Sequence, residues 1–150
     1  MVRVRKPSSR GAKKASLDDV ELLLKVAELY NTDYDFEAKE WFWGEYKEKS
    51  FEEFKSKYPQ GSKEYQFFER FTSRFELEGI LIEYGLLNED LYYDRYGSIK
   101  SEWEKSKPVV YGLRKEWGEP RYRENFELLA AGGGKWSDKH PPKITDVKKD

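Results

Sequence analysis

The sequence predicts an all-α protein, an irregular bundle of five to seven helices with a disordered basic N-terminal tail and a flexible C-terminal tail. Apolar residues recur every three to four positions through most of residues 16–131, which is the period of an amphipathic helix. Serine, asparagine and glycine stand where such helices would begin and end. Only the segment KPVVYG at 107–112 resembles a strand, and it is short. We therefore expect tails at residues 1–15 and 132–150 around one helical domain at 16–131.

The composition fits a single cytoplasmic domain. A length of 150 residues suits one domain, and the 17% of aromatic residues can fill a core although the apolar content is only 37%. No stretch approaches the roughly 20 apolar residues of a membrane span, and the polar N-terminus lacks the apolar segment of a signal peptide. The absence of cysteine excludes disulfides, thiolate catalysis and cysteine-based zinc sites.

The first predicted helix runs from Leu17 to about Asn31. Ser16 followed by Asp19 resembles a capping box, in which each side chain accepts from a backbone N–H group at the helix start. Apolar residues surround so much of this segment that we expect it to be buried on a broad face. They are Val20, Leu22, Leu23, Leu24, Val26, Ala27 and Leu29.

Two shorter helices are expected next. The first runs from about Asp35 to Glu48, and Gly44 weakens it by about 1 kcal/mol relative to alanine. Ser50 caps the second, which ends before Pro59.

The longest predicted helix begins after Ser62 and reaches Tyr84, where Gly85 stops it. At about 1.5 Å per residue it is roughly 35 Å long, enough to span the domain. Thr72 and Gly79 lie on its apolar stripe, and such small side chains let another helix approach closely.

Three more helices are expected at residues 88–96, 98–117 and 120–131. In the second, the apolar spacing continues straight through Pro108, which favours a kinked helix, although a split into two stays open. The glycines at 132–134 are expected to break the chain, and the residues after them look mostly disordered.

Charge is distributed unevenly along the chain. Residues 16–134 carry 17 basic and 26 acidic residues, whereas residues 1–15 carry six basic and no acidic residues. A basic tail can bind nucleic acid without sequence preference. With six positive charges, the logarithm of its binding constant for double-stranded DNA should fall with the logarithm of the salt concentration with a slope no steeper than about −5. The candidate nucleic-acid-binding residues are Arg3, Arg5, Lys6, Arg10, Lys13 and Lys14.

A second feature of the composition is its poverty in thermolabile residues. Cysteine, methionine, asparagine and glutamine together account for six residues, whereas lysine and glutamate are abundant. This pattern is typical of proteins from thermophiles.

No motif for catalysis, a metal or a cofactor is found. Gly134-Lys135 fails as a phosphate loop because Leu129 and Trp136 stand where the pattern needs glycine and a hydroxyl residue. The single histidine, His140, lies beside two prolines, so no Ser-His-Asp set and no Glu-x-x-His pair can form in the body. We expect no cofactor and consider an enzyme the least favoured class.

The segment EWFWGEY at 40–46 cannot direct all its rings to one side of a helix. At 100° per residue, Tyr34, Ala38, Trp41, Phe42 and Tyr46 form a core stripe, whereas Phe36 and Trp43 point the other way. Burial of those two rings beneath the chain's own loops is the preferred interpretation. The alternative is an exposed aromatic patch rimmed by charge, which marks interaction sites. The candidate protein-interaction residues are Phe36, Lys39, Trp43 and Lys47.

The stretch at 101–130 resembles the C-terminal half of an uncharacterised all-helical domain family of archaea and bacteria. The shared features are a tryptophan, a mid-helix proline, a following arginine and an NFE-L segment. They correspond here to Trp103, Pro108, Arg114, Asn125, Phe126, Glu127 and Leu129. The resemblance implies an all-helical fold and supplies no activity. Members often carry a membrane helix ahead of the domain, where this chain has a basic tail.

Two functional hypotheses of different classes follow. The first is a non-enzymatic protein-interaction or oligomerising module, which rests on the excess of aromatic residues. The second is a nucleic-acid-associated protein that binds through its tail, although an acidic body repels phosphate.

Overall fold

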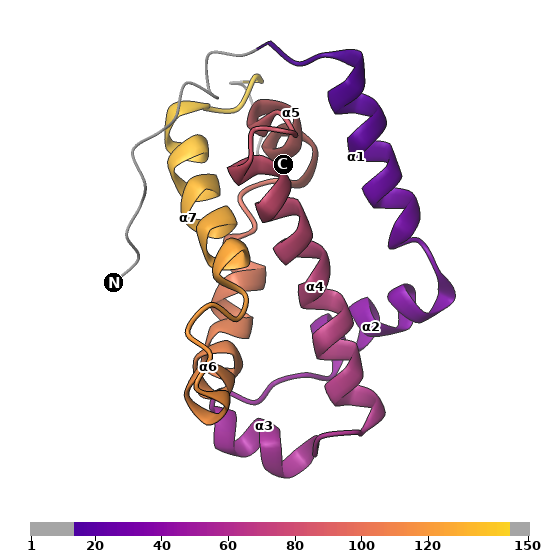
Figure 1. Cartoon of the computed structure of the whole chain (residues 1–150), viewed down its shortest axis with the longest axis vertical. Helices are drawn as coiled ribbons and strands as arrows, with labels where there is room; N and C mark the ends of the chain where they lie inside the picture. Colours follow the sequence, from indigo (N-terminus) through magenta and orange to yellow (C-terminus); the bar gives the residue numbers. More distant parts are fainter. Residues whose placement is uncertain (1–13, 145–150) are drawn as a thin grey trace, which may run out of the picture.

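The computed structural model describes residues 14–144, and that part of the chain forms seven helices and no strand (Figure 1). They are α1 (Leu17–Leu29), α2 (Asp33–Gly44), α3 (Phe51–Lys57), α4 (Lys63–Glu83), α5 (Glu89–Tyr96), α6 (Lys100–Trp117) and α7 (Glu124–Lys139). The predicted all-α bundle of five to seven helices is confirmed.

Helix α4 runs through the middle of the molecule and organises the rest (Figure 1). Helix α2 crosses the first half of α4, and α7 packs along the second half. Helix α6 packs against α7, while α3 and α5 lie at opposite ends of the bundle. Helix α1 stands on the outer side of α4, away from α6 and α7.

Aromatic rings build the core where α2 meets α4. The rings of Trp41 and Tyr46 stack with their centroids 5.2 Å apart, and the ring centroids of Phe42 and Phe71 lie 4.3 Å apart. Tyr46 is fully buried, and its hydroxyl donates to the Lys105 carbonyl of α6 at 2.9 Å. The predicted core positions in α2 are therefore correct except for Tyr34, which is exposed.

Most helix boundaries follow the predicted capping residues. Ser16, Ser50, Ser62 and Asn88 each accept a hydrogen bond from the backbone N–H three residues later. Helix α2 differs, because Thr32 caps it and it ends at Gly44 rather than near Glu48. Glycine is a weak helix former, so the chain leaves the helix there and Tyr46 reaches the core from outside it.

The expected break at the triple glycine is wrong. Helix α7 continues through residues 132–134 and ends at Lys139 instead of Ala131. A Cβ atom on Gly133 would lie 2.0 Å from the carbonyl oxygen of Ser98, so only glycine lets these two backbones meet. His140 also has a defined place, with its ring stacked 4.3 Å from that of Trp136.

Two further predictions are confirmed, the close approach of a helix to α4 and the continuity of the helix that contains Pro108. A Cβ atom on Gly79 would lie 2.2 Å from the carbonyl oxygen of Asn125, so glycine permits the close approach of α4 and α7. Thr72 is fully buried on the same side of α4. Helix α6 is continuous through Pro108 and is not split into two helices.

Of the candidate nucleic-acid-binding residues, the structure describes only Lys14, which is exposed. Arg3, Arg5, Lys6, Arg10 and Lys13 lie outside the described residues.

Candidate interaction surface

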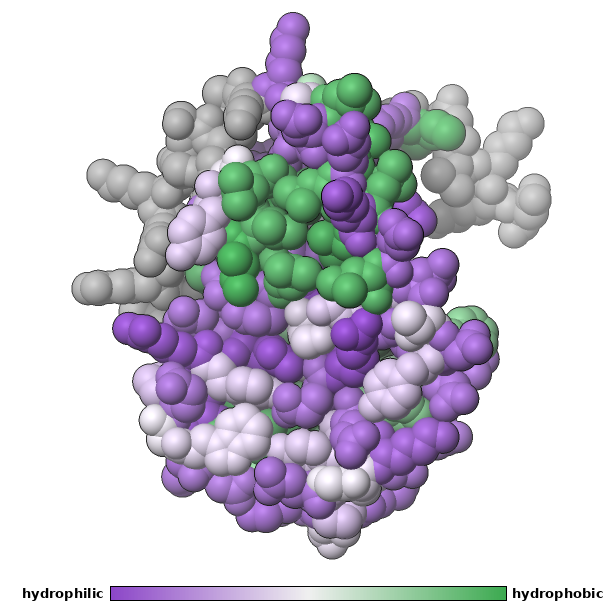
Figure 2. Space-filling view, turned by 45° about the vertical axis from the view of Figure 1, so that its right-hand side comes forward, coloured by the Kyte–Doolittle hydropathy of each residue, from purple (hydrophilic) through white to green (hydrophobic). Residues whose placement is uncertain are grey.

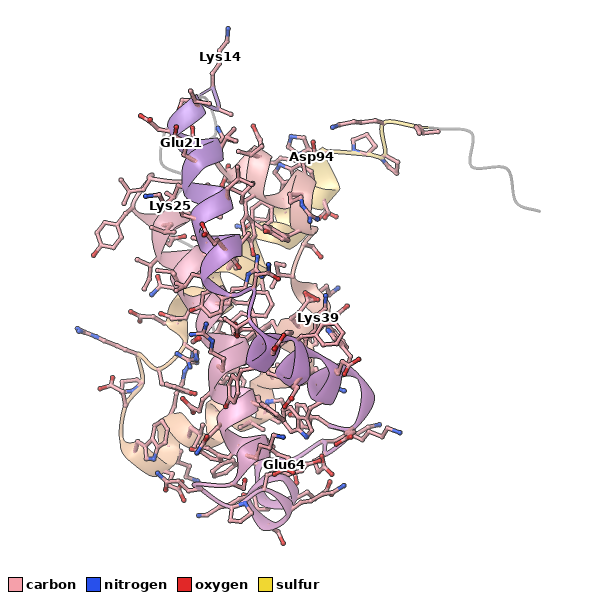
Figure 3. The ribbon with its side chains drawn as sticks, turned by 90° about the vertical axis from the view of Figure 1, so that its right-hand side faces the viewer. Lys14, Glu21, Lys25, Lys39, Glu64 and Asp94 are labelled. Carbon is pink, nitrogen blue, oxygen red and sulfur yellow. The ribbon has the colours of Figure 1, made fainter. Side chains whose placement is uncertain are left out.

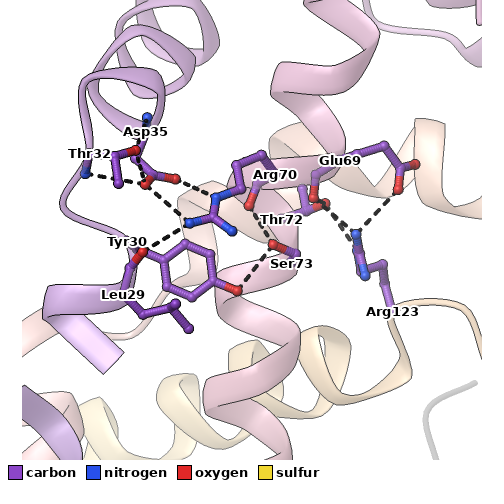
Figure 4. A network of polar contacts seen from close by, with 9 residues as sticks. All are labelled: Leu29, Tyr30, Thr32, Asp35, Glu69, Arg70, Thr72, Ser73 and Arg123. Carbon is purple, nitrogen blue, oxygen red and sulfur yellow. Dashed lines mark hydrogen bonds and ion pairs between the residues drawn. The ribbon is translucent and has the colours of Figure 1, made fainter. Parts of the chain in front are cut away.

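Helix α1 is held near its start by Asn88, which caps α5 just after α4, and at its end by α4 itself. At its start, the Asp19 carboxylate accepts a hydrogen bond of 2.9 Å from the backbone N–H of Asn88, just after α4. At its end, the Arg70 guanidinium donates to the Leu29 carbonyl at 3.0 Å, and the hydroxyls of Tyr30 and Ser73 share a hydrogen bond of 3.2 Å (Figure 4). These contacts make α1 antiparallel to the second half of α4.

The Arg70 contact at the end of α1 also reaches α2. The Arg70 guanidinium donates to both carboxylate oxygens of Asp35, at 2.6 and 3.2 Å, and stacks 4.2 Å from the Tyr30 ring. Burial would raise the pKa of Asp35, but hydrogen bonds from Arg70 and Thr32 outweigh it and lower that pKa. One partly buried ion pair thus holds the α1–α2 turn against α4 (Figure 4).

Between these two fastenings, α1 buries little of its apolar surface. Only Asp19, Leu23 and Val26 are buried, whereas Leu17 is 73% and Leu24 61% exposed. The expectation of burial on a broad face is wrong, because a helix that is apolar around most of its circumference needs neighbours on several sides. Among the described residues, α4 and the turn after it supply one side only.

The exposed side of α1 continues onto α4. Leu17, Val20 and Leu24 follow each other at spacings of three and four and so form one stripe. On α4, Leu77, Ile80 and Tyr84 lie four, seven and eleven residues after Ser73, which contacts α1, so they share the side of α4 turned toward α1. Leu86 follows in the next turn and is 60% exposed.

Figure 2 shows the result as a continuous apolar area in the upper half of the molecule. We call it the α1–α4 face. Apolar areas of such continuity on a folded domain mark binding surfaces, whereas single exposed leucines do not. It consists of five exposed residues, Leu17, Val20, Leu24, Tyr84 and Leu86, and of Leu77 and Ile80, which are half-buried between them.

The two aromatic residues of α2 that point away from the core, Phe36 and Trp43, are exposed, so the preferred interpretation of their burial is wrong. Phe36 is 63% and Trp43 45% exposed. Lys39 and Lys47 are exposed as well, although Lys47 lies beyond the end of the helix. Trp43 rests edge-on against the buried Phe42 ring at 5.0 Å, so its indole has a fixed support.

A groove of about 260 Å³ opens beside Trp43, between α2, α4, α5 and α6. Phe71, Phe75 and Tyr96 line it together with Trp43. Ile99 also lines it and begins α6 in the left-handed conformation, with a φ of 61°. That conformation is strained for a β-branched residue, and such strain persists only where surrounding contacts hold it.

Four charged groups line this groove, and two of them are paired with each other. Arg74 donates to the Glu78 carboxylate at 3.3 Å and to the Tyr96 hydroxyl at 2.8 Å, and the Tyr92 hydroxyl donates to Glu78 at 2.9 Å. Burial raises the pKa of Glu78 although Arg74 and Tyr92 oppose the rise. Glu78 is therefore satisfied within the fold.

The other two charges of the groove are Lys39 and Glu102. Neither has an ion-pair partner within residues 14–144. Burial raises the pKa of Glu102, and its own backbone N–H only partly opposes that rise. Lys39 lies one turn before Trp43 on the same side of α2 and is labelled in Figure 3.

The residues that carry the family resemblance have structural roles. Trp103 and Phe126 are buried in the core. Arg114 joins the end of α6 to α7 by donating to the Tyr122 carbonyl at 2.8 Å and to Glu127 at 2.9 Å. Asn125 lies at the start of α7, where its amide and backbone N–H groups both donate to Glu76 of α4.

Arg123 anchors the same end of α7. Its guanidinium donates to the hydroxyl of Thr72 at 3.0 Å and to the carbonyl of Glu69 at 3.0 Å (Figure 4). Arg123 has a φ of 56°, and these bonds hold its strained backbone.

Metal and membrane sites are not found in the part of the chain that the structure describes. Residues 14–144 contain no group of three histidine, cysteine or carboxylate side chains that could hold a metal ion. Over the same residues, no helix is both long and apolar enough to cross a membrane.

These features define an all-helical domain with an exposed apolar face over α1 and α4. Residues 15–136 match the domain of unknown function DUF4760, and the chain belongs to that family. The match extends far beyond the stretch at 101–130 from which the sequence indicated an uncharacterised helical family. No curated protein and no solved structure matches the chain.

Proposed function

We propose that this domain is a protein-interaction module whose α1–α4 face pairs with a second copy of the chain. The observation that carries the proposal is the continuous apolar area over α1 and the second half of α4 (Figure 2). Removing apolar surface from water contributes about 25 cal/mol per Å², and fully burying one leucine contributes about 1.5–3 kcal/mol. Leu17 and Leu24, both more than half exposed, are the largest contributors on α1.

The charges beside the face support a partner of identical sequence. A two-fold antiparallel contact sets Val20 of one α1 against Leu24 of the other. At about 1.5 Å per residue, Lys25 of one copy then lies at the level of residue 19 of the other, within reach of Asp18 and Glu21. All three side chains are exposed and have no ion-pair partner within the described chain. The apolar stripe and the charges of one copy are thus complementary to those of a second, identical copy.

Sedimentation equilibrium of matched leucine variants tests the proposal. Leu24→Gln places an amide in the centre of the face, whereas Leu29→Gln makes the same change about 140° around α1, outside the face. The two leucines are similarly exposed, at 61% and 54%. Each change occurs twice in a pair of copies, so Leu24→Gln should weaken association by about 3 kcal/mol, or on the order of 100-fold.

Leu29→Gln should associate like the natural protein. A natural protein that stays monomeric at high micromolar concentration refutes the proposal. Equal weakening by both variants would place the contact somewhere other than the α1–α4 face.

The composition supports a further proposal, that the protein comes from a thermophile. Its scarcity of cysteine, methionine, asparagine and glutamine is the supporting observation. We expect a thermal midpoint above about 65 °C, the upper end of the usual mesophile range. A calorimetric midpoint inside that range contradicts this origin.

A further inference from the structure

We propose that the groove beside Trp43 binds a small zwitterion of the amino-acid class. Glu102 holds its ammonium group, Lys39 holds its carboxylate, and the aromatic walls take its apolar side chain. The groove and the α1–α4 face share no residue, so this inference stands independently of the proposed pairing.

The charges of the groove determine the kind of ligand. Arg74 and Glu78 satisfy each other and add no net charge. Lys39 on α2 and Glu102 on α6 remain, one cation and one carboxylate on different helices, each without an ion-pair partner in the described chain. A cation alone would be repelled by Lys39 and an anion alone by Glu102. A molecule that carries both charges complements both side chains.

The surroundings of Glu102 favour an ammonium ligand over water. Burial disfavours its charged form, and among the described residues no cation offsets that cost. An ammonium group would supply charge-assisted hydrogen bonds, which are stronger in a partly buried site than in water. The titratable groups that also face the groove are Lys39, Arg74, Glu78 and Tyr96.

The walls of the groove favour an apolar side chain on the ligand. Phe71 and Phe75 of α4 and Trp43 of α2 present rings to it. A volume of about 260 Å³ lies just below the range of pockets for drug-sized molecules, so it suits a ligand of amino-acid size. Edge-on packing against Phe42 keeps the Trp43 ring in place as one wall.

Nuclear magnetic resonance tests this inference with three related probes. The indole N–H signal of Trp43, identified by its loss in Trp43→Phe, is followed during titration with L-leucine, L-leucinamide and N-acetyl-L-leucine. L-leucine carries both charges, L-leucinamide lacks the carboxylate and N-acetyl-L-leucine lacks the ammonium group. We expect saturable shifts with L-leucine and binding on the order of tenfold weaker for each of the other two.

Two glutamate variants separate a specific site from a general charge effect. Glu102→Gln should weaken L-leucine binding on the order of tenfold. Glu104→Gln should leave it unchanged, because Glu104 is exposed on the same helix and pairs with Lys107 at 2.9 Å. The remaining signals of each spectrum report whether the variant is folded.

Three results would overturn the inference. One is the absence of a saturable shift with L-leucine at millimolar concentration. Another is binding by Glu102→Gln as tight as that of the natural protein. The third is equal binding of L-leucinamide and L-leucine, which would show that Lys39 holds no carboxylate and that the site takes a simple organic cation.

Discussion

Adding one methyl group at either of two neighbouring glycines of α7 should change the free energy of unfolding in opposite directions. A Cβ atom on Gly134 meets nothing within 4 Å, whereas one on Gly133 would lie 2.0 Å from the backbone oxygen of Ser98. Alanine is favoured over glycine inside a helix by about 0.5–1 kcal/mol at either position. Overpacking a tight contact typically costs about 1–3 kcal/mol. Because both variants gain the same helix propensity, the difference between their free energies of unfolding measures the clash at Gly133 alone.

We therefore expect Gly134→Ala to stabilise the domain by about 0.5–1 kcal/mol and Gly133→Ala to be about 1–3 kcal/mol less stable than Gly134→Ala. Urea unfolding followed by circular dichroism measures this difference directly. Gly132→Ala should fall between the two, because its Cβ atom would meet the Tyr93 hydroxyl, the far end of a side chain, at 2.9 Å. Equal stability of Gly133→Ala and Gly134→Ala would refute the close contact, and with it the role of the triple glycine in helix packing.

Three further predictions test other parts of the structure. Asp35→Asn should cost about 1–3 kcal/mol at neutral pH. Because the pKa of Asp35 is lowered in the folded protein, this loss of stability should be complete above about pH 4 and should shrink as the pH falls further. Urea unfolding of both proteins at several pH values measures the loss. A loss of stability that does not change with pH contradicts the prediction. Trp43→Ala should cost less than about 2 kcal/mol, whereas Trp41→Ala, which removes a buried ring, should cost about 3–5 kcal/mol; equal costs would show that Trp43 belongs to the core. If residues 1–15 bind DNA, their deletion should abolish binding at low salt, and full retention by the shortened protein excludes that role.

Helix boundaries were predictable because they depend on local chemistry. Ser16, Ser62 and Asn88 cap helices through hydrogen bonds to the backbone three residues later, and a sequence displays that spacing directly. Gly85 follows α4 with a φ of 72°, a conformation that glycine adopts without steric cost.

The triple glycine was misjudged because its role depends on a distant segment. Glycine in isolation destabilises a helix, so residues 132–134 resemble a break. The structure brings Ser98 against Gly133, and glycine there removes a clash. Only the three-dimensional arrangement distinguishes a glycine that ends a helix from one that lets two backbones meet.

The exposed surfaces were predictable only in part for a related reason. Helical geometry correctly placed Phe36 and Trp43 on the side of α2 away from the core, but could not show what covers that side. The α1–α4 face was missed because periodicity reports which sides of a helix are apolar and not how many neighbours it has. The one available signal was the apolar surface around most of residues 17–29, more than a single neighbouring helix covers.

The most direct test of the central claim, pairing through the α1–α4 face, is the distance between identical spin labels on two copies. The chain has no cysteine, so Leu29→Cys and Glu64→Cys each create one labelling site outside the α1–α4 face; Figure 3 shows Glu64 at the start of α4. In the antiparallel pair, helix geometry places the two Leu29 sites about 20–30 Å apart and the two Glu64 sites about 50 Å apart. Double electron–electron resonance measures both distances. A short Leu29 distance with a long Glu64 distance is the predicted result, whereas no defined Leu29 distance, or a shorter one at Glu64, would contradict it.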